Sequence, residues 1–169
     1  MHTTMTALYK LIFVAALLVL GAGCSKKAAQ DPVAYQAGVD AYATGNFSVA
    51  LEKFRPLAEK GDAQAQFNLG VMYRQGQGVA QDDKQAVAWW SKAAEQGHVE
   101  AQDNLGLRYG RGQGVAQDWV QAYKWFSLAA TAGNETAKSN QRVAETKMTP
   151  QQVAQAQDLV REWQAQHQK

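Results

Sequence analysis

Few residues in this sequence have the types and spacing that a catalytic or ligand-binding site requires. The most prominent candidate is a glycine-rich loop. Gly110, Gly112 and Gly114 surround Arg111. Such a loop can cradle a phosphate when it joins a strand to the N-terminus of a helix. This loop lacks the preceding strand and the further glycine at the set spacing of a nucleotide fingerprint. We therefore interpret it as a turn between two helices.

No other pattern indicates catalysis or metal binding. His98 and His167 have no second ligand at metal spacing, and no thiol stands beside them. The motifs of serine nucleophiles and zinc hydrolases do not occur, and no pair of carboxylates recurs in a setting that suggests an acid and a base. We expect no metal, no cofactor and no enzymatic activity.

The single cysteine, Cys24, directly follows an apolar segment. Residues 11–20 are apolar and residues 21–23 are small, while Lys10 places a positive charge ahead of them. A run of about ten apolar residues is too short to span a bilayer, but it has the length of the hydrophobic region of a signal peptide. The chain is therefore expected to be exported. With one cysteine, its mature part cannot form an internal disulfide.

Residues 1–23 resemble a bacterial lipoprotein signal peptide. The resemblance implies cleavage between Gly23 and Cys24, lipidation of Cys24 and attachment to a membrane through the lipid. Ser25, in place of Asp, is similar to lipoproteins sent on to the outer membrane, where the chain would face the periplasm. Gly21 departs from the Leu that usually stands three positions before the cysteine. The alternative is an ordinary signal peptide that leaves Cys24 as a free thiol.

The composition favours helices and argues against a nucleic-acid partner. The 169 residues include only three prolines and carry a formal net charge of +2. Lys26 and Lys27 form the longest basic run. Nucleic-acid binding needs a basic patch or stripe, and the sequence shows none.

The dominant feature of the sequence is one segment that occurs twice. Residues 62–97 align without a gap with residues 98–133, and 20 of the 36 positions are identical. A repeat of this period indicates a stack of supersecondary units and argues against a single sheet or barrel. The sequence therefore predicts an all-α fold, an α/α solenoid of antiparallel helix pairs.

Local signals predict how each unit begins. The first helices are expected over 62–75 and 98–111, with N-caps at Asp62 and, in the next unit, at Asn134. His98 stands at the same position of its repeat, where it is an unusual residue, and we interpret it as a surface or capping residue. Two glycines in the following turn suit a loop that needs positive φ. Further glycines stand inside the first helices, where they indicate close contact with a neighbouring helix; these are Gly70 and Gly106.

The second helix of each unit is expected to pack through one narrow face. Asp82 and Gln85, like Asp118 and Gln121, are spaced as capping boxes. We also assign the aromatic pairs of these helices to the core. The predicted face of the first unit combines one large side chain with small ones: Ala86, Trp89, Ala93 and Ala94.

The segments outside the two repeats complete the predicted organisation. Near the C-terminus, Thr149, Pro150 and Gln152 indicate the start of a further helix. Polar terminal units cover the last core face of a solenoid. We assign a tether to 24–32, a degenerate tetratricopeptide-like helix pair to 33–61, and a degenerate repeat with a C-terminal cap to 134–169.

The repeated motif is closely similar to the Sel-one-like repeat (SLR), a relative of the tetratricopeptide repeat. It covers residues 65–97 and 101–133 and includes the glycine turn. The resemblance implies a solenoid that acts as an adaptor or scaffold and binds a protein or peptide partner. Some cysteine-rich members are linked to β-lactam hydrolysis, but those carry a disulfide pair in each repeat, which this sequence lacks.

In tetratricopeptide stacks one face of the first helices lines a concave groove, and we place the partner there. Phe67 and Leu107 would act as anchors, while Arg74 and Arg111 would orient a carboxylate-bearing partner. These positions differ between the repeats, as expected if they read a partner, although solvent-facing positions also drift. The predicted groove comprises Gln36, Asp40, Gln64, Phe67, Val71, Arg74, Gln75, Glu100, Asp103, Leu107 and Arg111.

Two further expectations concern contacts and rival functions. Trp119 stands where the sister repeat has Asp83, so it is either an exposed contact or locally packed. The leading prediction is a lipid-anchored adaptor of the bacterial cell envelope. The rivals are a cell-wall or β-lactam-related hydrolase on the same scaffold and a self-associating structural envelope protein.

Overall fold

The computed structural model describes residues 31–167, and every regular element in that range is an α-helix. The predicted all-α solenoid is confirmed. The signal peptide and the Gly23–Cys24 cleavage and lipidation site lie outside the described residues, as does most of the tether. The helices are α1 (Pro32–Ala43), α2 (Phe47–Glu59), α3 (Ala63–Gln75), α4 (Asp83–Glu95), α5 (Val99–Arg111), α6 (Trp119–Thr131), α7 (Glu135–Glu145) and α8 (Pro150–His167).

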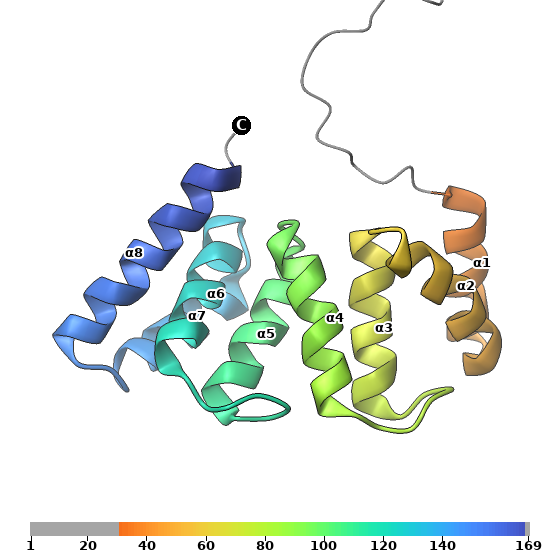
Figure 1. Cartoon of the computed structure of the whole chain (residues 1–169), viewed down its shortest axis with the longest axis horizontal. Coiled ribbons are helices and arrows are strands. Elements are labelled where there is room, and N and C mark those ends of the chain that lie inside the picture. Colours follow the sequence, from red (N-terminus) through yellow and green to blue (C-terminus); the bar gives the residue numbers. More distant parts are fainter. Residues whose placement is uncertain (1–30, 168–169) are drawn as a thin grey trace, which may run out of the picture.

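Successive helices pack side by side along the long axis of the molecule (Figure 1). The pair α1 and α2 forms one end, and α7 and α8 form the other. Each of the first six helices contacts the next one, so the core is continuous from pair to pair. Within residues 31–167, no helix is both long enough and apolar enough to cross a membrane.

The predicted caps begin the first helices of the repeats. Asp62 accepts a hydrogen bond from the backbone N–H of Ala65 at 2.8 Å, and His98 Nδ1 accepts one from Ala101 at 3.3 Å. Asn134 does the same for the helix that follows. Each bond satisfies one of the donors that a helix N-terminus leaves free. The same position of the repeat therefore caps a helix in three successive units.

Glycines with positive φ end these helices, as predicted. Gly76 and Gly112 close α3 and α5 in the left-handed conformation, at φ +66° and +65°. Two residues later, Gly78 and Gly114 both have φ +72°. Their loops reach back to the preceding helix pair, where Gly114 lies against the backbone of Asp83.

In α4, the second helix of the first repeat, Trp90 packs into the core instead of the predicted Trp89. Trp90 is 1% exposed and fills the space beside Gly70, whereas Trp89 is only half-buried. Ala86 and Ala94 stand four residues on either side of Trp90, so all three share one stripe of the helix. A β-carbon at Gly70 would lie 2.4 Å from Trp90 Nε1. The predicted close contact at this glycine is confirmed, but its partner is Trp90.

Buried glutamines join each repeat to the preceding pair. Gln66 Nε2 donates to the carbonyl of Ala58 at 3.0 Å, and Gln102 Nε2 donates to that of Ala94 at 3.1 Å. Both glutamines are almost fully buried. Because a buried amide without a partner would be costly, these bonds fix how successive pairs stack.

The last helix begins where the sequence indicated. The side chains of Thr149 and Gln152 bond each other's backbone N–H groups, which completes a capping box. The helix then packs along α6 instead of α7. Near its end, Trp163 Nε1 donates to Glu95 on α4 at 2.9 Å. Therefore α8 covers the second helices of both repeats.

Candidate functional site

The predicted groove residues of the two repeats lie on the first helices α3 and α5. We call this set the first-helix face. Its exposed members carry polar or charged side chains, and its half-buried members include the apolar ones. Exposed are Gln64, Arg74, Gln75, Glu100 and Arg111, and half-buried are Phe67, Val71, Asp103 and Leu107.

Gln36 and Asp40 on α1 do not extend this face. Gly38 lies against Phe54 as Gly70 lies against Trp90, so α1 and α3 align at an offset of 32 residues. Gln36 and Asp40 then correspond to Asn68 and Met72 in α3, which face the preceding pair: Asn68 bonds Tyr35 of α1, and Met72 is fully buried beside α2. The prediction placed them on the groove face, but the alignment set by the contact of Gly38 with Phe54 puts them at other positions of the helix.

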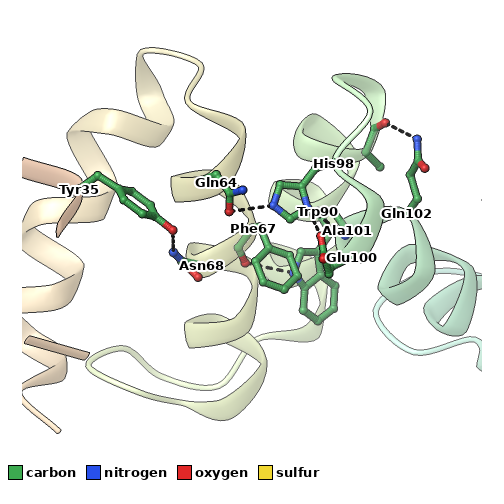
Figure 2. Close-up of polar contacts among 10 residues, drawn as sticks. Tyr35, Gln64, Phe67, Asn68, Trp90, His98, Glu100, Ala101 and Gln102 are labelled. Carbon is green, nitrogen blue, oxygen red and sulfur yellow. Dashed lines mark hydrogen bonds and ion pairs between the residues drawn. The ribbon is translucent and has the colours of Figure 1, made fainter. Parts of the chain in front are cut away.

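Phe67 is held in place by His98, as Figure 2 shows. The two rings stack with centroids 4.7 Å apart and planes at 16°. His98 Nε2 donates to Gln64 Oε1 at 3.1 Å, while its Nδ1 accepts from Ala101. These two bonds require a neutral imidazole with its proton on Nε2. Two α3 residues of the first-helix face are therefore fixed by the helix cap of the next repeat, a contact that sequence spacing did not suggest.

Burial lowers the pKa of His98, while the charges of Glu100 and Asp62 oppose this shift. The folded state therefore binds the proton more weakly than the unfolded chain, whose histidine has a pKa of about 6.5. The stability that neutral His98 contributes is complete above that pH. It is lost as the pH falls through this value and on to the lower pKa of the folded state.

We expect His98→Asn to remove this pH dependence. Asparagine caps the equivalent helix at Asn134, so the variant should keep a capped helix at neutral pH. Urea unfolding of both proteins between pH 7.5 and 5 measures the difference. Wild type should lose more stability on acidification than the variant. Parallel pH profiles would show that His98 is not the titrating group.

An apolar line crosses the first-helix face and continues onto α7. Val71, Leu107 and Val143 occupy the same repeat position, 36 residues apart. Val71 and Leu107 are half-buried, and Val143 is 53% exposed. Beside this line, Asp103 accepts a hydrogen bond from Asn140 Nδ2 of α7 at 3.0 Å. Val143 was not among the predicted groove residues, although extending the 36-residue phase by one unit leads from Leu107 to it.

Of the two alternatives for Trp119, an exposed contact or local packing, the structure shows local packing. The indole is half-buried and covers Gly110, where a β-carbon would lie 3.0 Å from its Cζ3 atom. It also contacts the cluster that contains Val120 and Tyr123. The sister repeat has Arg74 at the position of Gly110 and Asp83 at that of Trp119, so the two positions differ together.

The remaining features of residues 31–167 do not form a reactive centre. No group of three or more histidine, cysteine or acidic side chains in this range could hold a metal ion. An open cavity of about 430 Å³ lies between α6, α7 and α8, and Ser127 lines it. The Ser127 hydroxyl is buried without a hydrogen-bond partner among the described residues, so no base activates it.

The stacked helix pairs, with their first helices side by side on one face, place this chain in the class of helical-repeat solenoids. Within it, the Sel1 repeat model matches residues 63–98 and 99–134. The chain therefore contains two Sel1 repeats, which confirms the resemblance seen in the sequence. Solenoids of this kind generally serve as scaffolds for protein interactions.

Solved structures that are similar to this chain include two proteins with the same kind of repeat. A protective antigen present in uropathogenic Escherichia coli strains, which displays an SLR fold, is 38% identical with a TM-score of 0.75, covering 79% of this chain and 30% of that one. A Sel1 repeat protein from Oxalobacter formigenes is 32% identical with a TM-score of 0.61, covering 63% of this chain and 44% of that one. The chain thus spans less than half the length of either. The comparison with curated proteins found no match.

Proposed function

We propose that this chain is an exported, lipid-anchored adaptor of the bacterial cell envelope, which binds a segment of another protein on its first-helix face. The observation that carries the binding role is the apolar line of Val71, Leu107 and Val143 among exposed polar and charged side chains. Apolar anchors surrounded by a polar rim are typical of protein interfaces.

The anchor is proposed from the sequence. Cys24 follows the apolar run 11–20 and three small residues, as in a lipoprotein signal. A lipid on Cys24 would hold the solenoid at the outer membrane, facing the periplasm. Because one acyl chain gives only marginal membrane binding, stable attachment would need two or three.

We expect a photoreactive residue at position 143 to crosslink a specific envelope protein in living cells. Val143 is suited to this because it is exposed and stands in the apolar line. The matched control places the same photoreactive residue at Ala88, which is exposed on the second helix α4. Mass spectrometry of the crosslinked bands identifies the partner. The intact mass of the chain from the membrane fraction shows whether Cys24 carries acyl groups.

The two halves of the proposal fail independently. Equal bands from positions 143 and 88 would rule out the first-helix face as the binding surface. An unmodified Cys24 in soluble periplasm would rule out the anchor but leave the binding surface standing. Replacing Leu107 with serine should weaken the specific crosslink, because it places a polar group in the apolar line.

A further inference from the structure

Arg108 is a buried arginine at the junction between the two Sel1 repeats. It is 3% exposed, although it lies in the last turn of α5. Its Nη1 donates to Gln113 Oε1 at 2.6 Å, but its Nε is buried with no hydrogen-bond partner among residues 31–167. Burying an arginine is costly unless its charge is paired and its donors are used.

The preceding junction, between α1 and α3, is built from neutral groups instead. There Tyr42 donates its hydroxyl to Gln77 Oε1 at 2.7 Å and lies 3.2 Å from Gln75 Oε1, and the residue equivalent to Arg108 is the fully buried Met72. At the same places the next junction has arginines and one glutamine: Arg74 for Tyr42, Arg108 for Met72, Arg111 for Gln75 and Gln113 for Gln77. One solenoid thus contains a neutral and a cationic version of the same junction.

The three arginines of this junction have no anion to pair with in the described part of the chain. No ion pair there involves any of them, and Arg74 and Arg111 are exposed. Burial is the main cause that lowers the pKa of Arg108, and the positive charges of Arg74 and Arg111 lower it further. Asp83 acts in the opposite direction, but among the described residues it forms no ion pair. The junction therefore holds an excess of positive charge.

Two effects within the chain favour an arginine at this junction, but they do not account for all three arginines. Carbonyl groups at the C-terminal ends of α3 and α5 attract cations, but this effect is small and screened at exposed positions. The Arg108 guanidinium lies 5.8 Å from the centroid of the Trp90 ring, near the outer limit of a cation–π contact. Neither effect supplies a negative charge that would balance the three arginines.

We propose that Arg74, Arg108 and Arg111 form an anion site that takes a carboxylate of an acidic segment in the bound partner. Arg74 and Arg111 are exposed and would contact the carboxylate, while the buried charge of Arg108 strengthens the site from below. The site lies at the C-terminal ends of α3 and α5, where Val71 and Leu107 lie one turn away on the same helices. A segment with apolar side chains beside acidic ones would fit both. This inference rests on the proposed binding function and specifies the chemistry of its partner.

The site can be tested on the purified chain with defined probes. The acidic probe is acetyl-Leu-Glu-Glu-Leu-amide, and its neutral counterpart carries Gln in place of Glu. The readout is the NMR signals of the arginine Nε–H groups during titration. We expect the acidic probe, but not the neutral one, to shift the signal of Arg108. Arg108→Met should weaken binding of the acidic probe by about tenfold or more, because it removes a buried positive charge that attracts the carboxylate.

Matched variants separate this site from general charge effects. Arg142→Met removes one exposed arginine on α7 and should bind the acidic probe like wild type. Methionine already fills the equivalent position as Met72, so Arg108→Met should fold and melt at the same or a higher temperature without probe. The proposal is overturned if both probes bind equally, if Arg108→Met binds like wild type, or if it melts at a lower temperature.

A third titration, with inorganic phosphate, distinguishes the source of the anion. Tighter binding of phosphate than of the acidic probe would overturn the assignment to a peptide carboxylate. None of these measurements depends on the cellular partner. Failure of the anion site would therefore leave a crosslink through position 143 intact, and failure of that crosslink would leave the titration interpretable.

Discussion

Trp90→Ala is expected to lower the free energy of unfolding by about 3–5 kcal/mol, the range for removal of a large aromatic side chain from a core. Trp90 is 1% exposed, and its indole packs directly on Gly70. Its Nε1 also donates to the carbonyl of Phe67 at 3.2 Å. The substitution removes this bond and leaves a cavity between α3 and α4, which the paired backbones cannot easily close.

Trp89→Ala is the matched control for this experiment. Trp89 is the same residue type on the same helix, but it is half-buried and lies beneath Lys92, whose Nζ is 4.0 Å from the ring centroid. Because less of the Trp89 surface is removed from water on folding, Trp89→Ala should lower the free energy of unfolding clearly less than Trp90→Ala. Urea unfolding followed by circular dichroism measures both. Equal losses, or a larger loss at Trp89, would contradict the assignment of Trp90 to the core face.

The second large effect is expected at Gly114, where the loop of one repeat touches the backbone of the preceding one. A β-carbon at this position would lie 2.3 Å from the carbonyl oxygen of Asp83 and 2.5 Å from its carbon. These are backbone atoms of α4, so no side-chain rotation relieves the clash. Gly114→Ala should therefore separate the two repeats locally and destabilise the chain by about 1–3 kcal/mol beyond the conformational strain alone.

Gly45→Ala isolates that strain. Gly45 has φ +76°, close to the +72° of Gly114, but no atom lies within 4 Å of its β-carbon position. The free energy of unfolding of this variant should fall only by about 1–2 kcal/mol, the cost of placing alanine in the left-handed conformation. Thermal unfolding of the two variants gives the comparison. If both lose the same stability, the contact between Gly114 and Asp83 is not restrictive.

Helix positions could be read from the sequence because their signals are local. The capping bonds of Asp62, His98 and Asn134 each span three residues, and the positive φ of Gly76 and Gly112 is a property of single residues. Such signals act whatever the rest of the chain does. The period of 36 residues then carried the same assignment from one unit to the next.

The candidate binding surface was less predictable, because it depends on how each helix is rotated. Phe67 lies on the predicted face, but its ring is stacked on His98, which belongs to the next repeat. Gln36 and Asp40 were predicted to share this face, whereas the contact of Gly38 with Phe54 aligns α1 so that they lie on another side of the helix. A shift of one residue in the alignment of a helix changes which side chains share a face.

By itself, the sequence determined that this is an all-helical solenoid with two Sel1 repeats, because caps, glycines and the repeat period are encoded locally. Only the tertiary structure decided which of two adjacent tryptophans fills the core, that α8 packs on α6, and that Arg108 is buried at the repeat junction. Neighbouring residues on a helix point in different directions. Which of them is buried depends on the helices packed against it, and those lie tens of residues away in the chain.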